Sequence, residues 1–594
     1  LNSKVIKDIR IIRGGFNAQW GGRASSVVEI TGKTGNENNM KVDAGADELS
    51  ADVAVEGPMG KKISYVVAAR RSFTDYYRSS LYSALMGVTR PDFSSIQALT
   101  AEPDAVKPNF YYFDANAKLT YKPNIRDVIS VSSYTSGDKL TYNQNTQNPY
   151  VEEDADWKTT GIGLRWARQW GGSFYHNLTI GGSSFSQNFM HQDSIMRYRQ
   201  ASPRDTVLKN YNLDNTLNDL SLNLLLQLKP DEHNTIEGGV NSNLVDLSYR
   251  ESYFHDVNGL NIIDTIRSSG NLSAIYSGWL QNTFSRGKLK ALTIGIRTTY
   301  HNLSEKFYLE PRLQAIVAPS SHYSLKLAAG VYNQYVNRVV QANSSGVYRN
   351  FWIVSDGKLF PVVESHHLVA GMTWEDKGWL IDVEGYLKYT DGISFIQNVT
   401  RRVNGNQFKT TTFLLSLDSR AAGVDLLVRK DWSKGQVWAA YSLSHSFNKS
   451  PQLNGGDEYY AIDDHLHEFK ISGIYTAGKW RLSASWIYGS PKPWDEILLT
   501  SSMQLSPDYV KNAGRWVPYH RLDAGLAFVQ QVGKVELTAG AKVFNLYNRQ
   551  NVLGKPYTLS DTPVQDYLAG RAVITFQEVE GMGFTPMFYL NLKF

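Results

Sequence analysis

Residues 587–594, Met-Phe-Tyr-Leu-Asn-Leu-Lys-Phe, alternate between apolar and polar side chains and end the chain on an aromatic residue. In a β-strand, successive side chains point to opposite faces. One face here carries only apolar side chains, namely Phe588, Leu590, Leu592 and Phe594. The other face carries Tyr589, Asn591 and Lys593. The pattern is typical of a wall between lipid and a wet lumen, as in a transmembrane β-barrel, but a half-buried strand of a soluble sheet alternates in the same way.

The alternation recurs along the chain, in the runs 323–331, 379–389, 480–486 and 534–543. In each run an apolar row stands opposite polar or charged side chains; Asp382 and Glu384, for example, lie opposite Trp379, Ile381 and Val383. The alternation alone does not separate a barrel from a sandwich. The length of the chain, the sustained repetition and the aromatic residues at the ends of the runs favour the barrel.

Short turns and long polar connections alternate between these runs. The short turns lie at 57–60, 123–124, 171–172, 230–231, 286–287, 320–321, 376–378, 433–435, 477–478 and 532–533. Longer stretches, expected to be loops, lie at 74–108, 139–155, 188–214, 335–364, 390–418, 448–463, 489–515 and 546–585. Short periplasmic turns and long extracellular loops are the asymmetry of outer-membrane barrels.

The turns also set the strand number. Ten hairpins supply twenty strands, and the runs near 40–46 and 587–594 bring the total to about 22, a size associated with a plugged lumen. The sequence therefore predicts an all-β protein, a transmembrane β-barrel of about 22 antiparallel strands over residues 39–594 with long extracellular loops.

The composition agrees with a barrel and excludes other classes. The chain has 594 residues, a mean hydropathy of −0.34 and no apolar run of the length that a transmembrane helix needs. Aromatic residues make up 12%, which fits girdles at both membrane interfaces. The chain has no cysteine, so it forms no disulfide and no thiolate metal site. A net charge of +5 does not argue for binding nucleic acid.

No motif for catalysis or for a metal stands out. The nucleophile elbow and the zinc-protease motif are both missing, so we expect no enzyme, no catalytic residue and no cofactor. His465 and His467 share a strand face but lack further metal ligands, and His366 and His367 lie on opposite faces. The long stretches are rich in Asn, Ser, Tyr and Asp, and they do not reveal a ligand.

Residues 1–38 do not follow the rhythm of the barrel. Two short apolar strands flank a loop with the pairs Gly14-Gly15 and Gly21-Gly22, and glycine permits close approach of the backbone. Neither the Walker spacing nor the dinucleotide-binding fingerprint is present, so these glycines do not indicate a phosphate site.

The segment resembles the end of the plug domain of TonB-dependent outer-membrane transporters. The matching residues are Arg13-Gly14, Trp20-Gly21 and the run 24–30. Further similarities to the Bacteroidota-type branch are Glu56-Gly57-Pro58, Ala69-Arg70-Arg71-Ser72, Glu310-Pro311-Arg312 opening a strand, Asp464 with His467 before a strand, and Asn545-Leu546-Tyr547-Asn548. The resemblance covers the whole chain and implies that residues 1–38 are the C-terminal part of a plug domain.

The resemblance also implies a location and partners. The protein is expected in the bacterial outer membrane, among its lipids, and to bind TonB through a segment N-terminal to this sequence. Because the chain begins at Leu1 without Met or a signal peptide, we expect a mature or incomplete sequence.

Contacts between plug and lumen are the candidate site. In the resembling family, plug arginines pair with lumenal carboxylates, for which the arginine fork is suited. The residues concerned are Arg10, Arg13 and Arg23 on the segment, and Glu310, Arg312, Asp382, Glu384, Asp425 and Glu536 on the wall. Independent solvation of these charges is the alternative.

Two functions stay open at this point. The first is a TonB-dependent receptor that imports an unidentified nutrient of the siderophore, glycan, peptide or cofactor class. The second is a structural barrel subunit of a larger outer-membrane complex, which docks surface lipoproteins or another barrel.

Overall fold

The fold is taken from a computed structural model of the chain. It describes residues 2–88, 108–145, 150–199, 202–257, 260–268, 272–342, 348–404, 407–494, 510–554, 557–559, 574–576 and 578–594.

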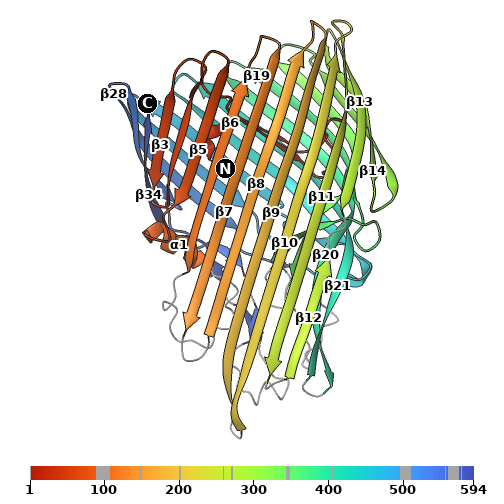
Figure 1. Ribbon diagram of the computed structural model, residues 1–594, viewed down its shortest axis with the longest axis vertical. Helices are drawn as coiled ribbons and strands as arrows, with labels where there is room; N and C mark the ends of the chain where they lie inside the picture. The colour runs from red at the N-terminus through yellow and green to blue at the C-terminus, as the bar shows by residue number, and fades with distance from the viewer. Residues whose placement is uncertain are drawn as a thin grey trace.

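The described chain is dominated by one closed antiparallel barrel of 22 spanning strands, as the sequence predicts. The strands are tilted against the barrel axis, and the C-terminus lies at the end with the short turns (Figure 1). The barrel closes where the last strand pairs with the first one, with Ala44 opposite Leu592 and Ala46 opposite Leu590. Closure leaves no free strand edge, which a membrane-spanning sheet requires.

The first eleven spanning strands are β3 (Lys41–Asp47), β4 (Ser50–Pro58), β5 (Ile63–Ser72), β6 (Asn109–Tyr121), β7 (Asp127–Asn145), β8 (Tyr150–Gln169), β9 (Phe174–Arg199), β10 (Ser202–Leu228), β11 (Asn234–Val257), β13 (Ser273–Arg286) and β14 (Leu289–His301). The other eleven are β15 (Lys306–Val317), β16 (Tyr323–Gln334), β19 (Val363–Asp376), β20 (Trp379–Asn404), β21 (Gln407–Trp432), β22 (Gly435–Lys449), β24 (His467–Ala477), β25 (Trp480–Gly489), β28 (Tyr519–Val532), β29 (Val535–Phe544) and β34 (Thr585–Lys593). Each of the ten predicted short turns joins two neighbouring strands.

Several stretches expected to be loops are instead continuations of strands. The stretches 139–155, 188–214 and 390–418 belong largely to the hairpins β7–β8, β9–β10 and β20–β21, whose ladders run on past the ends of other strands of the barrel (Figure 1). The prediction was wrong there because polar side chains on both faces hide the alternation, while paired strands still satisfy every backbone N–H and C=O. Parts of the predicted loops 74–108, 489–515 and 546–585 lie outside the described residues.

The strand containing Glu310-Pro311-Arg312 also differs from the prediction. These residues lie within β15 and do not open it. On the N-terminal side of Pro311 the strand is held by its ladder to β14, which begins at Lys306, whereas its pairing with β16 starts only at Arg312. Proline lacks an N–H, and at this position the missing donor interrupts no ladder to β16.

The remaining elements are short. They are η1 (Ser3–Val5), β1 (Ile6–Ile12), β2 (Val27–Gly32), α1 (Ser80–Val88), β12 (Leu260–Ser268), β17 (Val336–Ala342), β18 (Tyr348–Val354), η2 (Asn454–Gly456), β23 (Tyr459–Tyr460), β26 (Pro493–Trp494), β27 (Gly514–Arg515), β30 (Val552–Gly554), β31 (Tyr557–Leu559), β32 (Ile574–Phe576) and β33 (Val579–Glu580). Among the described residues, none of the helices is long and apolar enough to cross a membrane.

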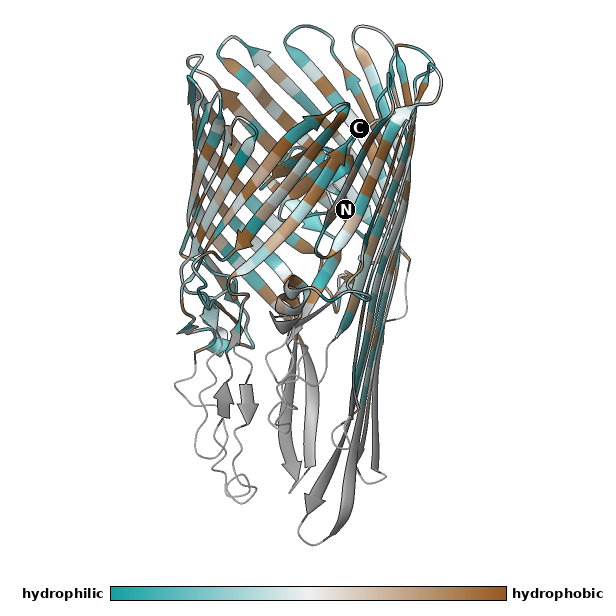
Figure 2. Ribbon diagram, turned by 90° about the vertical axis from the view of Figure 1, so that its left-hand side faces the viewer, coloured by the Kyte–Doolittle hydropathy of each residue, from teal (hydrophilic) through white to brown (hydrophobic). Residues whose placement is uncertain are grey.

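The wall has one apolar and one polar face. Along its strands apolar and polar residues alternate (Figure 2). On β34 the apolar side chains point outward, with Phe588 58% and Leu590 45% exposed in the isolated protein. On β20, Trp379 and Tyr389 lie at the two ends of the outward apolar row, where aromatic girdles meet the membrane interfaces. The faces predicted from the sequence are confirmed for these strands.

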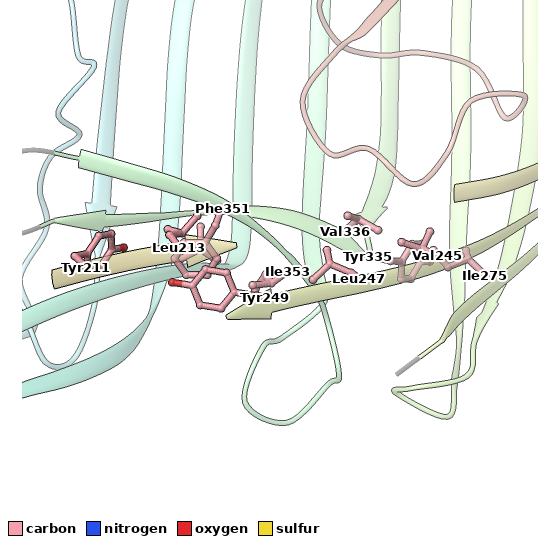
Figure 3. Close-up of a cluster of buried hydrophobic side chains, with 11 residues drawn as sticks. Tyr211, Leu213, Val245, Leu247, Tyr249, Ile275, Tyr335, Val336, Phe351 and Ile353 are labelled. Atoms are coloured by element: carbon pink, nitrogen blue, oxygen red, sulfur yellow. The ribbon is translucent and has the colours of Figure 1, made fainter. Parts of the chain in front are cut away.

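A hairpin, β17–β18, packs against the inner face of the wall at the end opposite the short turns. Its Val339, Phe351 and Ile353 are buried against side chains of β10 and β11 (Figure 3). The rings of Phe351 and Tyr249 stack with centroids 4.0 Å apart. The hairpin also pairs in parallel with β20, with its backbone at Val340 opposite Phe395. The half of the lumen opposite the short turns therefore contains an apolar core of its own.

Candidate functional site

The candidate site is the contact between the N-terminal segment (residues 1–38, described from residue 2) and the lumenal wall. Strands β1 and β2 form a separate two-stranded sheet, with Arg10 opposite Glu29. The N-terminus of the chain lies within the barrel in both ribbon views (Figures 1 and 2). The loop between the two strands carries both Gly-Gly pairs and makes most of the contacts with the wall.

Phe16 is the apolar anchor of this loop. Its side chain is 1% exposed, and its ring centroid lies 4.2 Å from that of Tyr332. The Tyr332 hydroxyl donates to the Phe16 carbonyl oxygen at 3.1 Å. The Arg312 guanidinium lies 3.6 Å from the centroid of the Tyr332 ring, and His367 meets the edge of the Phe16 ring. Aromatic and cation–π contacts with the wall thus enclose the Phe16 side chain.

Arg312 is held in place by its own strand. Its Nη2 atom donates to Glu310 Oε2 at 2.7 Å, and both side chains are buried. A buried pair of this kind fixes geometry more than it adds stability, because desolvation offsets most of the attraction. Glu310 therefore positions Arg312, which lies two residues further along β15 and whose guanidinium covers the Phe16 ring.

The next part of the loop is bound through its backbone. Ala18 N–H donates to Gln281 Oε1 at 3.0 Å, and Arg297 Nη1 donates to the carbonyl oxygens of Ala18 and Gln19, both at 3.3 Å. Gly21 makes this approach feasible, since a Cβ there would lie 2.1 Å from Arg297 Nε. The absence of a side chain at Gly21 thus allows Arg297 of the wall to pack against the loop.

The first Gly-Gly pair has a comparable role. Gly15 has a φ of 61°, and a Cβ there would lie 2.4 Å from the Ala328 Cβ. Its carbonyl oxygen accepts a hydrogen bond from Gln314 Nε2. The carbonyl oxygen of Arg13, the residue before Gly14-Gly15, accepts a hydrogen bond from Lys388 Nζ at 2.7 Å. Positive φ and close packing both require glycine at position 15.

Two further groups of contacts complete the site. Ala24 donates its N–H to Gln334 Oε1 at 3.2 Å and accepts from His367 Nε2 at 3.0 Å. Toward the short-turn end, Lys4 forms ion pairs with Asp43 and Asp52 at 3.0 and 2.9 Å. The segment is therefore tied both to strands between β13 and β20 and to the first strands of the barrel.

The charged residues singled out from the sequence have different environments. Arg13 Nη1 lies 2.6 Å from Asp425 Oδ2, but the Arg13 side chain is 66% exposed, so the pair adds little stability. Arg10 is exposed, and Arg23 donates to the Gly22 carbonyl oxygen.

On the wall, Asp382 pairs with Lys326 of the barrel at 2.8 Å. Glu384 lies opposite Asp425 in the ladder, and Glu536 lies opposite Lys593.

Sequence reasoning missed the neutral and wall-borne partners, namely Gln281, Arg297, Gln314, Gln334 and His367. Their only signal was their position on inward-facing sites of alternating strands. No sequence motif marks a glutamine whose side chain accepts a hydrogen bond from a backbone N–H more than 200 residues away in sequence. In the part of the chain that the structure describes, no cluster of three or more His, Asp or Glu side chains could hold a metal ion.

The fold and the lumenal segment define the class of protein, an outer-membrane β-barrel of the receptor type. Residues 95–546 match the family model described as TonB dependent receptor-like, beta-barrel, and the chain therefore belongs to this family. It follows that the protein resides in the bacterial outer membrane. No curated protein sequence matches the chain.

Solved structures support the fold. The outer-membrane transporter YddB from Escherichia coli is similar with a TM-score of 0.66 at 11% identity, over 100% of this chain and 85% of that one. The copper transporter OprC matches with a TM-score of 0.64 at 12% identity, over 98% of this chain and 85% of the other. A mutant of the ferric enterobactin receptor PfeA from Pseudomonas aeruginosa matches with a TM-score of 0.64 at 12% identity, over 100% and 85%.

Proposed function

We propose that this protein is a TonB-dependent importer, and that residues 1–38 are the C-terminal part of a plug domain that closes its lumen. One observation carries the proposal. The segment is held in the lumen mainly by side chains of the wall that bind its backbone, at Arg13, Gly15, Ala18 and Ala24. Phe16 is its large apolar anchor.

Such contacts suit a segment that must move. Each hydrogen bond contributes about 0.5–1.5 kcal/mol net, because water replaces the lost partner when the segment leaves a wet lumen. An apolar interface of equal area would instead expose its surface to water when the segment leaves, and the free-energy cost would be proportional to that area. A pulling partner such as TonB would break the polar contacts one after another. Family membership supports TonB as that partner.

The comparisons do not identify the cargo. The structural neighbours include a copper transporter, a ferric enterobactin receptor and a ferric citrate transporter. At 12% identity their cargo is no guide to the cargo of this protein.

The proposal is tested by tethering the segment to the wall. The chain has no cysteine, so A18C combined with G295C introduces one pair of thiols. A Cβ at position 295 would lie 3.0 Å from the Ala18 Cβ and 2.9 Å from the Gln281 Cβ, so both neighbours must move apart slightly to reach disulfide geometry. Cells expressing each form receive a defined mixture of ferric siderophores, copper, cobalamin, oligosaccharides and peptides. Mass spectrometry follows the depletion of each component.

We expect at least one component to be depleted only when both the protein and TonB are present. The oxidised double-cysteine variant should stop this depletion, and reduction should restore it, while A18C and G295C alone serve as controls. Depletion that is independent of TonB, or that persists in the tethered protein, contradicts the proposal. A lack of depletion together with copurifying outer-membrane subunits would favour the scaffold function instead.

A further inference from the structure

The end of strand β16 contacts two parts of the lumen, the N-terminal segment and the hairpin β17–β18. On the segment side, the Tyr332 hydroxyl donates to the Phe16 carbonyl oxygen at 3.1 Å. On the hairpin side, Tyr335 is 1% exposed and belongs to the buried cluster of the hairpin (Figure 3). Gln334 lies between these two tyrosines in sequence, and its side chain reaches both parts.

The Gln334 side chain uses both ends of its amide. Its Oε1 atom accepts a hydrogen bond from the Ala24 N–H at 3.2 Å. Its Nε2 atom donates to the Val336 carbonyl oxygen at 3.1 Å and to Asn337 Oδ1 at 2.9 Å. The partners fix the orientation of the amide, because a backbone N–H only donates and a backbone carbonyl only accepts. One planar group therefore connects the segment to the first two residues of the hairpin.

From Gln334 the hydrogen bonds continue to the other end of the hairpin. Asn337 Nδ2 donates to Ser355 Oγ at 2.7 Å, and the Ser355 hydroxyl donates to the Pro361 carbonyl oxygen at 2.8 Å. The Ser355 N–H donates to the Tyr335 carbonyl oxygen at 2.8 Å. Asn337 and Ser355 are both buried. The base of the hairpin, where the chain leaves the wall and returns to it, is thus held by one network that begins at Gln334.

On the segment, Ala24 is the residue that meets this network. Its N–H is bound by Gln334 of β16 and its carbonyl oxygen by His367 Nε2 of β19, at 3.0 Å. The loop cannot leave the wall without freeing the Gln334 oxygen. A freed amide takes water as its partner and can rotate, so it holds the hairpin less firmly.

We propose that Gln334 couples the docking of the N-terminal segment to the docking of the hairpin β17–β18, so that displacement of one loosens the other. Linked hydrogen bonds strengthen one another, so the loss of Ala24 weakens the bonds to Val336 and Asn337. Such a coupling acts equally in both directions. Its role in import rests on the proposed function, because a pull on the segment would then also loosen the hairpin in the half of the lumen opposite the short turns.

The test is amide hydrogen exchange of the full chain in detergent, followed by mass spectrometry at residues 336–342 and 348–354. Phe16→Ala weakens the docking of the segment without touching the hairpin. We expect it to speed exchange in the hairpin about threefold to tenfold, the range that corresponds to the loss of one hydrogen bond. Unchanged exchange in the hairpin of Phe16→Ala overturns the proposal.

Two glutamine variants show whether Gln334 carries the effect. Gln334→Met keeps the length of the side chain and removes its hydrogen bonds, so adding Phe16→Ala to it should change hairpin exchange less than about twofold. Gln314→Met is the matched control. Gln314 Nε2 binds the Gly15 carbonyl oxygen of the segment from β15, and within the described residues none of its hydrogen bonds goes to the hairpin. In that background Phe16→Ala should keep its full effect. An equal effect of Phe16→Ala in the Gln334→Met and wild-type backgrounds overturns the proposal.

The opposite direction gives an independent check. Phe351→Ala loosens the hairpin through its buried cluster. By reciprocity, it should speed exchange at residues 16–26 of the segment by the same factor by which Phe16→Ala speeds exchange in the hairpin. Segment exchange that stays at the wild-type rate in Phe351→Ala contradicts the coupling.

The coupling and the import function fail separately. Exchange is measured on the purified protein without TonB and without cargo, so a lack of TonB-dependent depletion in cells leaves its result standing. Uncoupled exchange of segment and hairpin overturns the role of Gln334 and leaves TonB-dependent import untouched.

Discussion

Phe16→Ala should release the N-terminal segment from the lumen while leaving the barrel intact. Phe16 is the largest buried apolar side chain of the segment, enclosed by Tyr332, His367 and Arg312. Truncation of a buried phenylalanine costs about 3–5 kcal/mol, because burial is lost and a cavity remains. The wall strands keep all their ladder hydrogen bonds, so the loss falls on the docking of the segment.

Amide hydrogen exchange, followed by mass spectrometry, measures this loss. Since 1.4 kcal/mol corresponds to a factor of ten, protection of the amides within residues 5–32 should fall by a factor of about 100 or more. Amides of β13–β16 should keep their protection. Ile9→Ala provides the control, since Ile9 is 52% exposed and its truncation should change protection by less than about 0.5 kcal/mol.

Two results would refute this reasoning. Unchanged protection of residues 5–32 in Phe16→Ala would mean that the loop does not depend on its aromatic anchor. An equal loss of protection in β13–β16 would mean that the segment and the barrel unfold together, and the picture of a separately docked segment would be wrong.

Three further predictions concern other parts of the molecule. Leu590→Arg on the lipid face should lower the unfolding free energy in lipid vesicles by about 2–4 kcal/mol, measured by tryptophan fluorescence in urea, whereas Asn591→Arg on the lumenal face should change it far less. Phe351→Ala should speed amide exchange in β17–β18 by removing the ring stacked on Tyr249, and unchanged exchange there would contradict the buried cluster. In the short turn at 230–231, hydrogen bonds from the Asn234 side chain and from the His233 and Asn234 N–H groups lower the pKa of Asp231. Its stabilising contribution is therefore present above the unfolded pKa of about 3.9 and lost as the pH falls through the folded value, so the stability difference between the wild type and Asp231→Ala should shrink in acid.

Much of the architecture could be predicted from the sequence, because a barrel strand has to alternate. The faces of β20 and β34 and the ten short turns follow from period two and from turn residues. The hairpins beyond the membrane could not be predicted in this way. Outside the lipid both faces of β9 and β10 are polar in many places, so the pattern that marks a strand disappears although the ladder continues.

The site was harder to predict than the fold. A search for opposite charges points to Arg10, Arg13 and Arg23, and among these an ion pair joins the exposed Arg13 to Asp425. The wall binds the segment mostly through its backbone, and a backbone carbonyl carries no sequence signal. The two Gly-Gly pairs were the accessible signal, since Gly15 and Gly21 are small where Ala328 and Arg297 come close.

The central claim is that the N-terminal segment closes the lumen and is moved by TonB. Labelling of a single cysteine at position 18 tests it most directly, because Ala18 is fully buried against the wall. Cells carrying A18C are treated with a membrane-impermeant maleimide in complete medium, with and without TonB. We expect labelling that requires TonB and stays at the buried baseline without it. Equal labelling in both strains would contradict the account.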